Sequence, residues 1–136
     1  ETNGAKVQFV YRYFPLQSLH PNAMSAARSA EAAGKQNKFW EMHDLLFERQ
    51  TEWSGEKNVR DVFTRYVGEL GLNVGNFIAD FENSSATDRV NRDYQSGVNA
   101  GVEGTPTFFL NGAKIDNPRS YDEFQRLIDA VVAKKS

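Results

Sequence analysis

The 136-residue chain contains no cysteine. Disulfide bonds, thiolate nucleophiles and thiolate metal sites are therefore excluded within this sequence. The chain by itself has no group that could exchange a disulfide.

Long hydrophobic runs are also absent. No apolar stretch approaches the roughly 18 residues needed to span a bilayer, and the N-terminus has no basic stretch followed by an apolar one. We therefore expect neither membrane insertion nor a targeting segment in this sequence. Because the first residue is Glu1 and the first methionine is Met24, we expect the chain to be a processed product or a cut piece.

An excess of positive charge is missing as well. The formal net charge is −2, so no basic field attracts phosphates, and nucleic acid is not expected as a partner. Hydrophobic residues make up 40% of the chain and charged residues 25%, close to the averages of globular proteins. The composition predicts a folded soluble domain with one core.

The middle of the chain is expected to be entirely helical, because its apolar residues recur every three or four positions. Loops are expected at Trp53 with Ser54-Gly55 and at Asn83-Ser84-Ser85. The predicted helices cover 23–33 with a stop at Gly34, 39–48, 59–70 before Gly71, a short helix capped by Asn73 that carries Phe77 and Phe81, and a segment holding Val90, Tyr94 and Val98.

Strand patterns occur near both ends of the chain. Val7–Phe14 is rich in β-branched and aromatic residues, which predicts a strand. Thr107–Leu110 and Ala113–Ile115 flank the turn pair Asn111-Gly112, which predicts a β-hairpin. Ser120 to Glu123 fits a capping box before a final amphipathic helix. The expected order is one strand, about five helices, two strands and a helix.

Three stretches together resemble the bacterial DsbA-like family of thiol-disulfide oxidoreductases. They are Phe9-Val10-Tyr11-Arg12-Tyr13-Phe14-Pro15-Leu16 running to His20-Pro21-Asn22-Ala23, Phe39-Trp40-Glu41-Met42-His43-Asp44, and Gly104-Thr105-Pro106-Thr107-Phe108-Phe109. The resemblance implies an α/β, thioredoxin-like fold with a helical insertion at about 21–101. Residues 1–136 would then form a single, incomplete domain that lacks the first, central strand and the active-site helix.

The resemblance also implies an activity and a location. Members of this family exchange dithiols and disulfides on proteins outside the cytoplasm, through a Cys-x-x-Cys pair at the start of the first helix. That pair precedes the strand expected at Val7–Phe14. The chain is therefore interpreted as the remainder of a periplasmic or secreted disulfide oxidase or isomerase, with no catalytic residue of its own and no cofactor.

In the thioredoxin-like arrangement that the resemblance implies, the absent strand would lie between the two strands expected at Val7–Phe14 and Thr107–Leu110. Without it, facing rows of backbone groups would lose their partners, at about 1–3 kcal/mol for each buried group. We hypothesise that a missing N-terminal segment or a swapped strand in a homodimer supplies it, or that the flanking strands close up directly.

The resemblance also implies a substrate-binding role for Gly104, Thr105 and Pro106. A cis Thr105–Pro106 bond would expose the preceding backbone to an extended or unfolded protein substrate. An ordinary turn proline is the alternative. A redox partner protein is a further expected partner.

Other chemically capable residues are better explained by structure. His20 and His43 share no metal motif, so capping or core roles are expected and no metal is assigned. Asp80 and Glu82 are two residues apart and should face different sides of a helix. The aromatic set is expected to be mostly core; it comprises Phe39, Trp40, Phe47, Trp53, Phe63, Tyr66, Phe77 and Phe81.

Two other functions remain open. The chain could be a redox-inactive, thioredoxin-like module that holds extended peptides, or a relative of the glutathione-dependent transferases and isomerases, in which the same loop grips the glutathione backbone.

Overall fold

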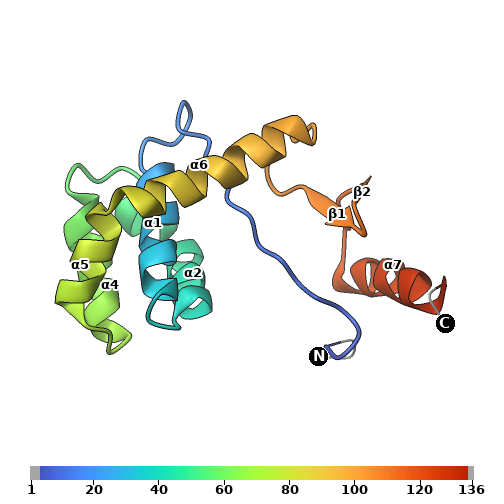
Figure 1. Ribbon diagram of the computed structural model, residues 1–136, viewed down its shortest axis with the longest axis horizontal. Helices are drawn as coiled ribbons and strands as arrows, with labels where there is room; N and C mark the ends of the chain where they lie inside the picture. Colours follow the sequence, from blue (N-terminus) through green and yellow to red (C-terminus); the bar gives the residue numbers. More distant parts are fainter. Residues whose placement is uncertain (1–3, 135–136) are drawn as a thin grey trace. The chain divides into compact units, whose positions relative to one another are not determined.

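The computed structural model describes residues 4–134 and has the α/β composition expected from the sequence. Its helices and a small sheet follow one another as shown in Figure 1. They are α1 (Ala23–Gly34), α2 (Phe39–Glu48), α3 (Gln50–Trp53), α4 (Val59–Glu69), α5 (Val74–Glu82), α6 (Ser84–Asn99), β1 (Phe108–Leu110), β2 (Ala113–Ile115) and α7 (Tyr121–Lys134).

The chain divides into two compact units. The helical unit comprises residues 12–99 and contains α1 to α6. The hairpin unit comprises residues 4–11 and 100–134 of the described chain and contains β1, β2 and α7.

Helix α1 is the centre of the helical unit and packs against α2, α4, α5 and α6. Its buried face consists largely of small side chains, including Ala26, Ala30 and Ala33, which let neighbouring helices approach closely. The space around it is filled by large side chains that are almost fully removed from water, namely Met42, Phe63, Tyr66, Val67, Phe77 and Val90. Burial of such groups is the main favourable term in folding.

The aromatic set is mostly core, as predicted. Phe63 lies 5.8 Å from Trp53 and 6.4 Å from Phe81, measured between ring centroids. Trp40 and Phe47 on α2 are exceptions, with 46% and 62% of their surface exposed. Helical spacing identified the side of α2 that they share but could not show how much of that side is covered.

The helix boundaries are set largely by local signals. Asn73 caps α5 as predicted, since its side-chain oxygen accepts a hydrogen bond from the N–H of Asn76 at 2.8 Å. Gly71 follows α4 with a φ of 71°, a left-handed conformation that glycine adopts without a steric cost.

The prediction of a loop at Trp53 is wrong, because Trp53 ends the short helix α3. Its indole N–H donates to the carbonyl of Leu46 at 2.8 Å while its ring is buried. This tertiary contact anchors the four residues of α3. It also explains why the helical unit has one more helix than the sequence predicted.

The predicted strand at Val7–Phe14 is also wrong, since these residues form no strand. A strand needs a neighbour for its backbone ladder, and the sheet found among residues 4–134 pairs β1 with β2. The direct closure of two flanking strands is therefore not observed. The end of this segment is bonded to α6 instead: the N–H of Tyr13 donates to Asp93, and Arg12 donates to the hydroxyl of Ser96.

The hairpin is confirmed. Phe108 is opposite Ile115, and Leu110 is opposite Ala113. Asn111 and Gly112 have φ angles of 50° and 80°, the pair of positive values that a two-residue type I′ turn requires.

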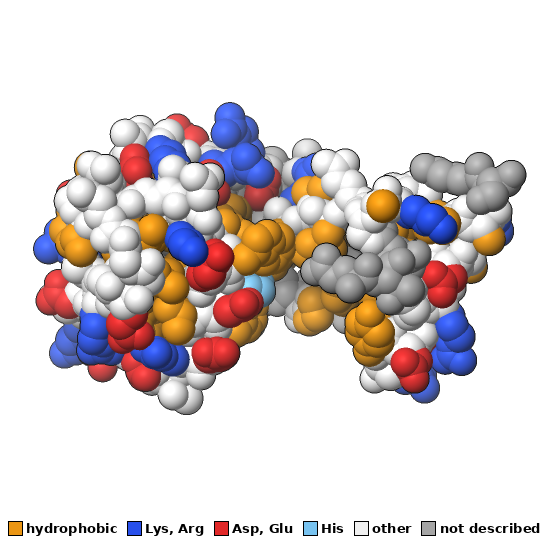
Figure 2. Space-filling view, turned by 90° about the horizontal axis from the view of Figure 1, so that it is seen from below, with side chains coloured by type: hydrophobic (Ala, Val, Ile, Leu, Met, Phe, Trp, Pro, Cys, Tyr) orange, Lys and Arg blue, Asp and Glu red, His pale blue; other side chains and the backbone are white. Residues whose placement is uncertain are grey.

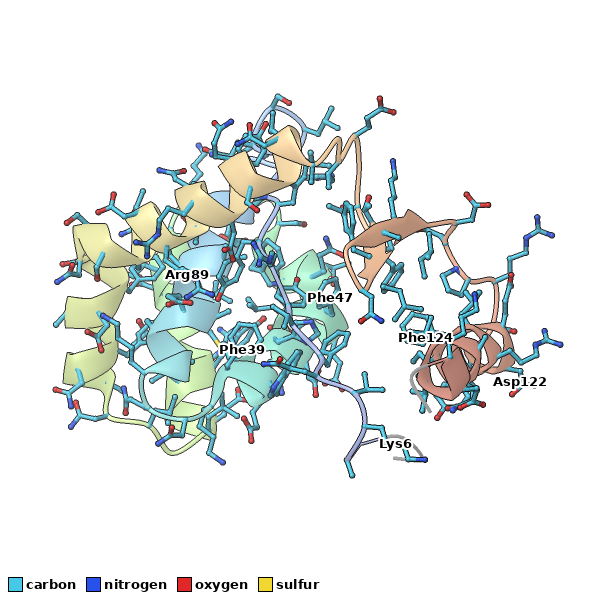
Figure 3. The ribbon with its side chains drawn as sticks, turned by 45° about the vertical axis from the view of Figure 1, so that its right-hand side comes forward. Lys6, Phe39, Phe47, Arg89, Asp122 and Phe124 are labelled. Atoms are coloured by element: carbon cyan, nitrogen blue, oxygen red, sulfur yellow. The ribbon has the colours of Figure 1, made fainter. Side chains whose placement is uncertain are left out.

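Helix α7 begins at the predicted position with half of the predicted capping box. The N–H of Glu123 donates to the hydroxyl of Ser120 at 3.1 Å, but the Glu123 carboxylate accepts from the N–H of Arg119 rather than that of Ser120. Phe124 on α7, labelled in Figure 3, lies against Phe108 of the hairpin, and their ring centroids are 5.4 Å apart. This ring contact fixes the helix to the sheet within the hairpin unit.

Candidate functional site

The loop that leads into β1 forms the candidate site. The peptide bond between Thr105 and Pro106 is cis. Together with the end of β2 and the segment after it, the loop lines an open depression of about 460 Å³. Its lining residues are Glu103, Gly104, Thr105, Pro106, Thr107, Lys114, Ile115, Asp116 and Asn117. All three residues predicted to bind substrate are therefore at the depression.

Two side chains hold the backbone of this loop. The hydroxyl of Thr107 donates to the carbonyl of Gly104 at 2.6 Å. The side-chain amide of Asn117 donates to the carbonyl of Pro106 at 2.8 Å. Both carbonyls on either side of Thr105 are thus already satisfied within the chain.

The backbone groups of Thr105, in contrast to these two carbonyls, are available for binding. Within residues 4–134, neither its N–H nor its C=O takes part in a hydrogen bond, and Thr105 is exposed. A Cβ placed on the neighbouring Gly104 would meet no atom within 4 Å, so the space beside it is open. One donor and one acceptor on an exposed backbone can pair with an extended peptide in the manner of an added strand.

The depression offers charged and polar groups but no thiol. Its ionisable side chains are those of Glu103, Lys114 and Asp116, and the sequence has no cysteine. Charges of both signs line the depression, which does not select strongly for an anionic or a cationic ligand. The arrangement can orient a peptide but supplies no thiol to react with it.

The two histidines lie far from the loop in the sequence, and their contacts are those of residues with a structural role. His20 accepts a hydrogen bond from Ala23 through its backbone carbonyl, so the turn before α1 uses its main chain rather than its ring. His43 has its Nδ1 3.0 Å from Asp44 and its ring 4.9 Å from that of Phe47. Residues 4–134 contain no cluster of three histidine or acidic side chains that could hold a metal ion.

Asp80 and Glu82 do not form a carboxylate pair. Asp80 lies 3.3 Å from the Lys35 ammonium, and Glu82 lies 2.6 Å from the Arg60 guanidinium. The two acids face different partners, as their spacing predicted. On the face seen in Figure 2, acidic and basic side chains are interspersed over the helical unit, and no basic patch is visible there.

Sequence reasoning missed Asn117 as part of the site and did not assign a role to the Thr107 hydroxyl. The pair Asn117-Pro118 is a recognisable loop signal, yet it does not reveal which carbonyl the amide contacts. Eleven residues separate Asn117 from Pro106, and only the folded hairpin brings them together.

The chain is similar to known proteins over most of its length. Residues 2–130 match the sequence model of a family described as Thioredoxin. The chain is 38% identical over 129 residues to the Na(+)/H(+) antiporter NhaA of Herminiimonas arsenicoxydans, covering 95% of this chain and 19% of that protein. It is 34% identical over 127 residues to the Na(+)/H(+) antiporter NhaA 3 of Salinispora tropica, covering 93% of this chain and 19% of that protein.

These curated relatives are far longer than the chain, which spans about a fifth of their length. None of the helices described between residues 4 and 134 has the length and apolar character needed to cross a bilayer. Among solved structures, the oxidoreductase DsbA from Xylella fastidiosa matches with a TM-score of 0.63 and 18% identity, over 80% of this chain and 60% of that one.

Proposed function

Since the chain belongs to the Thioredoxin family and has a DsbA-like thioredoxin fold, we propose that it is the peptide-binding part of a thiol-disulfide oxidoreductase. The redox cysteines of this enzyme would lie outside the present sequence. In this proposal the chain orients extended or unfolded protein substrates, and the thiol chemistry belongs to a Cys-x-x-Cys segment of the parent protein. The parent acts outside the cytoplasm and is recycled by a redox partner protein.

The observation that carries the proposal is the exposed, unbonded backbone of Thr105 between two carbonyls that are held by Thr107 and Asn117. A peptide that pairs with one N–H and one C=O is recognised by its main chain. Substrates of different sequence can therefore bind at the same place. This property suits an enzyme that must act on many unfolded proteins.

The apolar side of α7 in the hairpin unit also favours the pairing of a further strand with the sheet. Helix α7 carries Phe124, Leu127 and Ile128 on one side, yet none of its described residues is fully buried. We propose that an N-terminal strand of the parent, or the same strand swapped from a second copy, pairs with β1 and brings these side chains into a larger core. Size-exclusion chromatography of the full gene product would distinguish a monomer from a swapped dimer.

Peptide binding is tested with two substitutions at one position. Thr105→Pro removes the N–H, whereas Thr105→Ala changes the side chain and keeps the backbone groups. Isothermal titration with unfolded, cysteine-free peptides should show binding to the wild type and to Thr105→Ala, and much weaker binding to Thr105→Pro. Circular dichroism checks that both variants fold.

Absence of peptide binding by the wild type, or equal binding by Thr105→Pro, would contradict the proposal. Titration with glutathione in parallel distinguishes a glutathione-dependent relative, which would bind that tripeptide in preference to longer peptides. The proposal that the parent protein carries out thiol chemistry requires that its gene encode a Cys-x-x-Cys pair upstream of Glu1.

A second candidate function comes from the names of the curated relatives, which are Na(+)/H(+) antiporters. Identity of 38% over nearly the whole chain favours a role as a thioredoxin-like domain attached to such a transporter. Sodium-dependent proton movement in inverted membrane vesicles containing the full gene product would support this role. Vesicles with normal amounts of the protein but no such movement would exclude it.

A further inference from the structure

Asn117 occupies an unusual place relative to the candidate peptide-binding loop. It lies two residues beyond the end of β2 and is exposed to solvent. Its side-chain amide nevertheless reaches back to the carbonyl of Pro106, at an N···O distance of 2.8 Å. An exposed asparagine gains little stability from such a bond, because water could replace it.

The bond has a greater effect on the order of the loop than on overall stability. The other side-chain clamp is the Thr107 hydroxyl, which contacts Gly104 only three residues away and so stays within the loop. Among residues 4–134, the hydrogen bond from the Asn117 amide is the one side-chain bond that connects the loop to the segment following β2. It fixes the carbonyl of Pro106, the residue after Thr105, and therefore the direction of the Thr105 backbone.

We propose that Asn117 is a positioning residue for peptide binding, which holds the Pro106 carbonyl so that the N–H and C=O of Thr105 are ordered before a peptide arrives. This inference rests on the proposed function and extends it by one residue. A loop that is already ordered loses less conformational freedom on binding, so the complex is tighter. The N–H that Asn117 donates to Pro106 is not available to the peptide.

The role requires a hydrogen-bond donor, and this requirement can be tested with an isosteric substitution. In Asn117→Asp the ionised carboxylate has no donor and is repelled by the Pro106 carbonyl, whereas the protonated acid can donate through its O–H. The side chain of aspartic acid is ordinarily protonated below about pH 4. Glu103, Lys114 and Asp116 line the same depression, so the wild type measured at each pH is the reference.

The experiment uses the full chain in three forms, namely wild type, Asn117→Ala and Asn117→Asp, with Asn99→Ala in the helical unit as the matched control. Three quantities are measured: affinity for an unfolded cysteine-free peptide, the backbone ¹⁵N order parameters of Thr105 and Thr107, and the melting temperature. We expect Asn117→Ala to bind about tenfold more weakly, mainly through faster dissociation. Order parameters at the loop should fall, while the melting temperature and the control variant stay close to the wild type.

For Asn117→Asp we expect the same weakening at pH 7 and recovery toward the wild-type affinity at pH 4. A variant that acted only by perturbing the shape of the loop would show no such recovery. Unchanged loop order and unchanged affinity in Asn117→Ala would overturn the proposal. A clearly lowered melting temperature of Asn117→Ala would also overturn it, because Asn117 would then be a general structural residue.

The two proposals fail in different ways. If the wild type binds no peptide, the proposed function is wrong, and the order parameters of the peptide-free loop alone decide whether Asn117 positions Thr105. If the wild type binds peptide and Asn117→Ala binds equally well, the proposed function stands and the role of Asn117 is rejected.

Discussion

The buried carboxylate of Asp93 accepts a hydrogen bond from the backbone N–H of Tyr13, with an N···O distance of 3.2 Å. These residues are 80 positions apart, and the bond fastens the segment before α1 to α6. Arg89, one turn earlier on α6, lies 3.5 Å from the same carboxylate (labelled in Figure 3). Asp93 thus accepts a hydrogen bond from a buried backbone donor.

Asp93→Ala should lower the free energy of unfolding by about 1–3 kcal/mol, because the buried N–H of Tyr13 loses its acceptor. Asp93→Asn should cost less, since the amide oxygen can still accept from that N–H. Urea denaturation followed by circular dichroism measures both. Equal losses would show that the ion pair with Arg89, rather than the bond to Tyr13, is the dominant contribution.

Arg28 on α1 is expected to be required for the end of α5. Its guanidinium lies 4.6 Å from the centroid of the Phe81 ring and donates to the Phe81 carbonyl. Lysine retains the charge but not the planar group, so Arg28→Lys should destabilise the fold by about 1–2 kcal/mol. The exposed Arg60, paired with Glu82, is the control. Arg60→Lys should cost well under 1 kcal/mol, and a similar loss for both variants would refute the special role of Arg28.

Tyr66 should make the stability of the helical unit sensitive to alkaline pH. Burial of the side chain, and then its hydrogen bond to Glu52 at 2.9 Å, raise the pKa of Tyr66 to about 12 from 10.0. A pKa that is higher in the folded state gives stability that is complete below pH 10 and is lost as the pH rises through 12.

The measurement is the free energy of unfolding from urea titrations at several pH values up to 12, for the wild type and for Tyr66→Phe. The wild type should lose stability more steeply than the variant between pH 10 and 12, because phenylalanine has no proton to release. Parallel curves would mean that Tyr66 ionises similarly in the folded and unfolded states.

Thr107 gives a prediction about the local clamp of the loop. Thr107→Val removes the hydroxyl that donates to Gly104 but keeps the β-branched shape. Peptide affinity should fall several-fold, whereas Thr107→Ser should bind as the wild type does. Isothermal titration compares the three proteins. A Thr107→Ser variant that binds as weakly as Thr107→Val would show that the methyl group, and not the hydroxyl, is what the loop requires.

Local features were predicted well because their causes are contained in a few neighbouring residues. The bounds of α2 agree with the predicted Phe39–Glu48, since apolar residues that recur at helical spacing indicate how far a helix extends. The turn at Asn111-Gly112 was predicted because few residue pairs adopt two positive φ angles. The loop at Gly104, Thr105 and Pro106 was predicted from the family resemblance, which rests on three stretches along the chain.

Features that depend on distant partners were not predictable in the same way. The composition of Val7–Phe14 favours a strand, yet a strand forms only where another strand offers its backbone, and the structure bonds Tyr13 to Asp93 instead. The exposure of Trp40 and Phe47 likewise depends on what packs against α2 and not on their spacing along it.

The candidate site combines both kinds of information. The sequence by itself determined that the chain has no thiol, and it singled out Gly104, Thr105 and Pro106 as the candidate loop, because residue chemistry and a short motif are local properties. Only the tertiary structure decided which polar groups of that loop remain available. The hairpin folds Asn117 back onto the carbonyl of Pro106 across eleven residues, and a hydrogen bond of that kind depends on distance in space rather than on position in the chain.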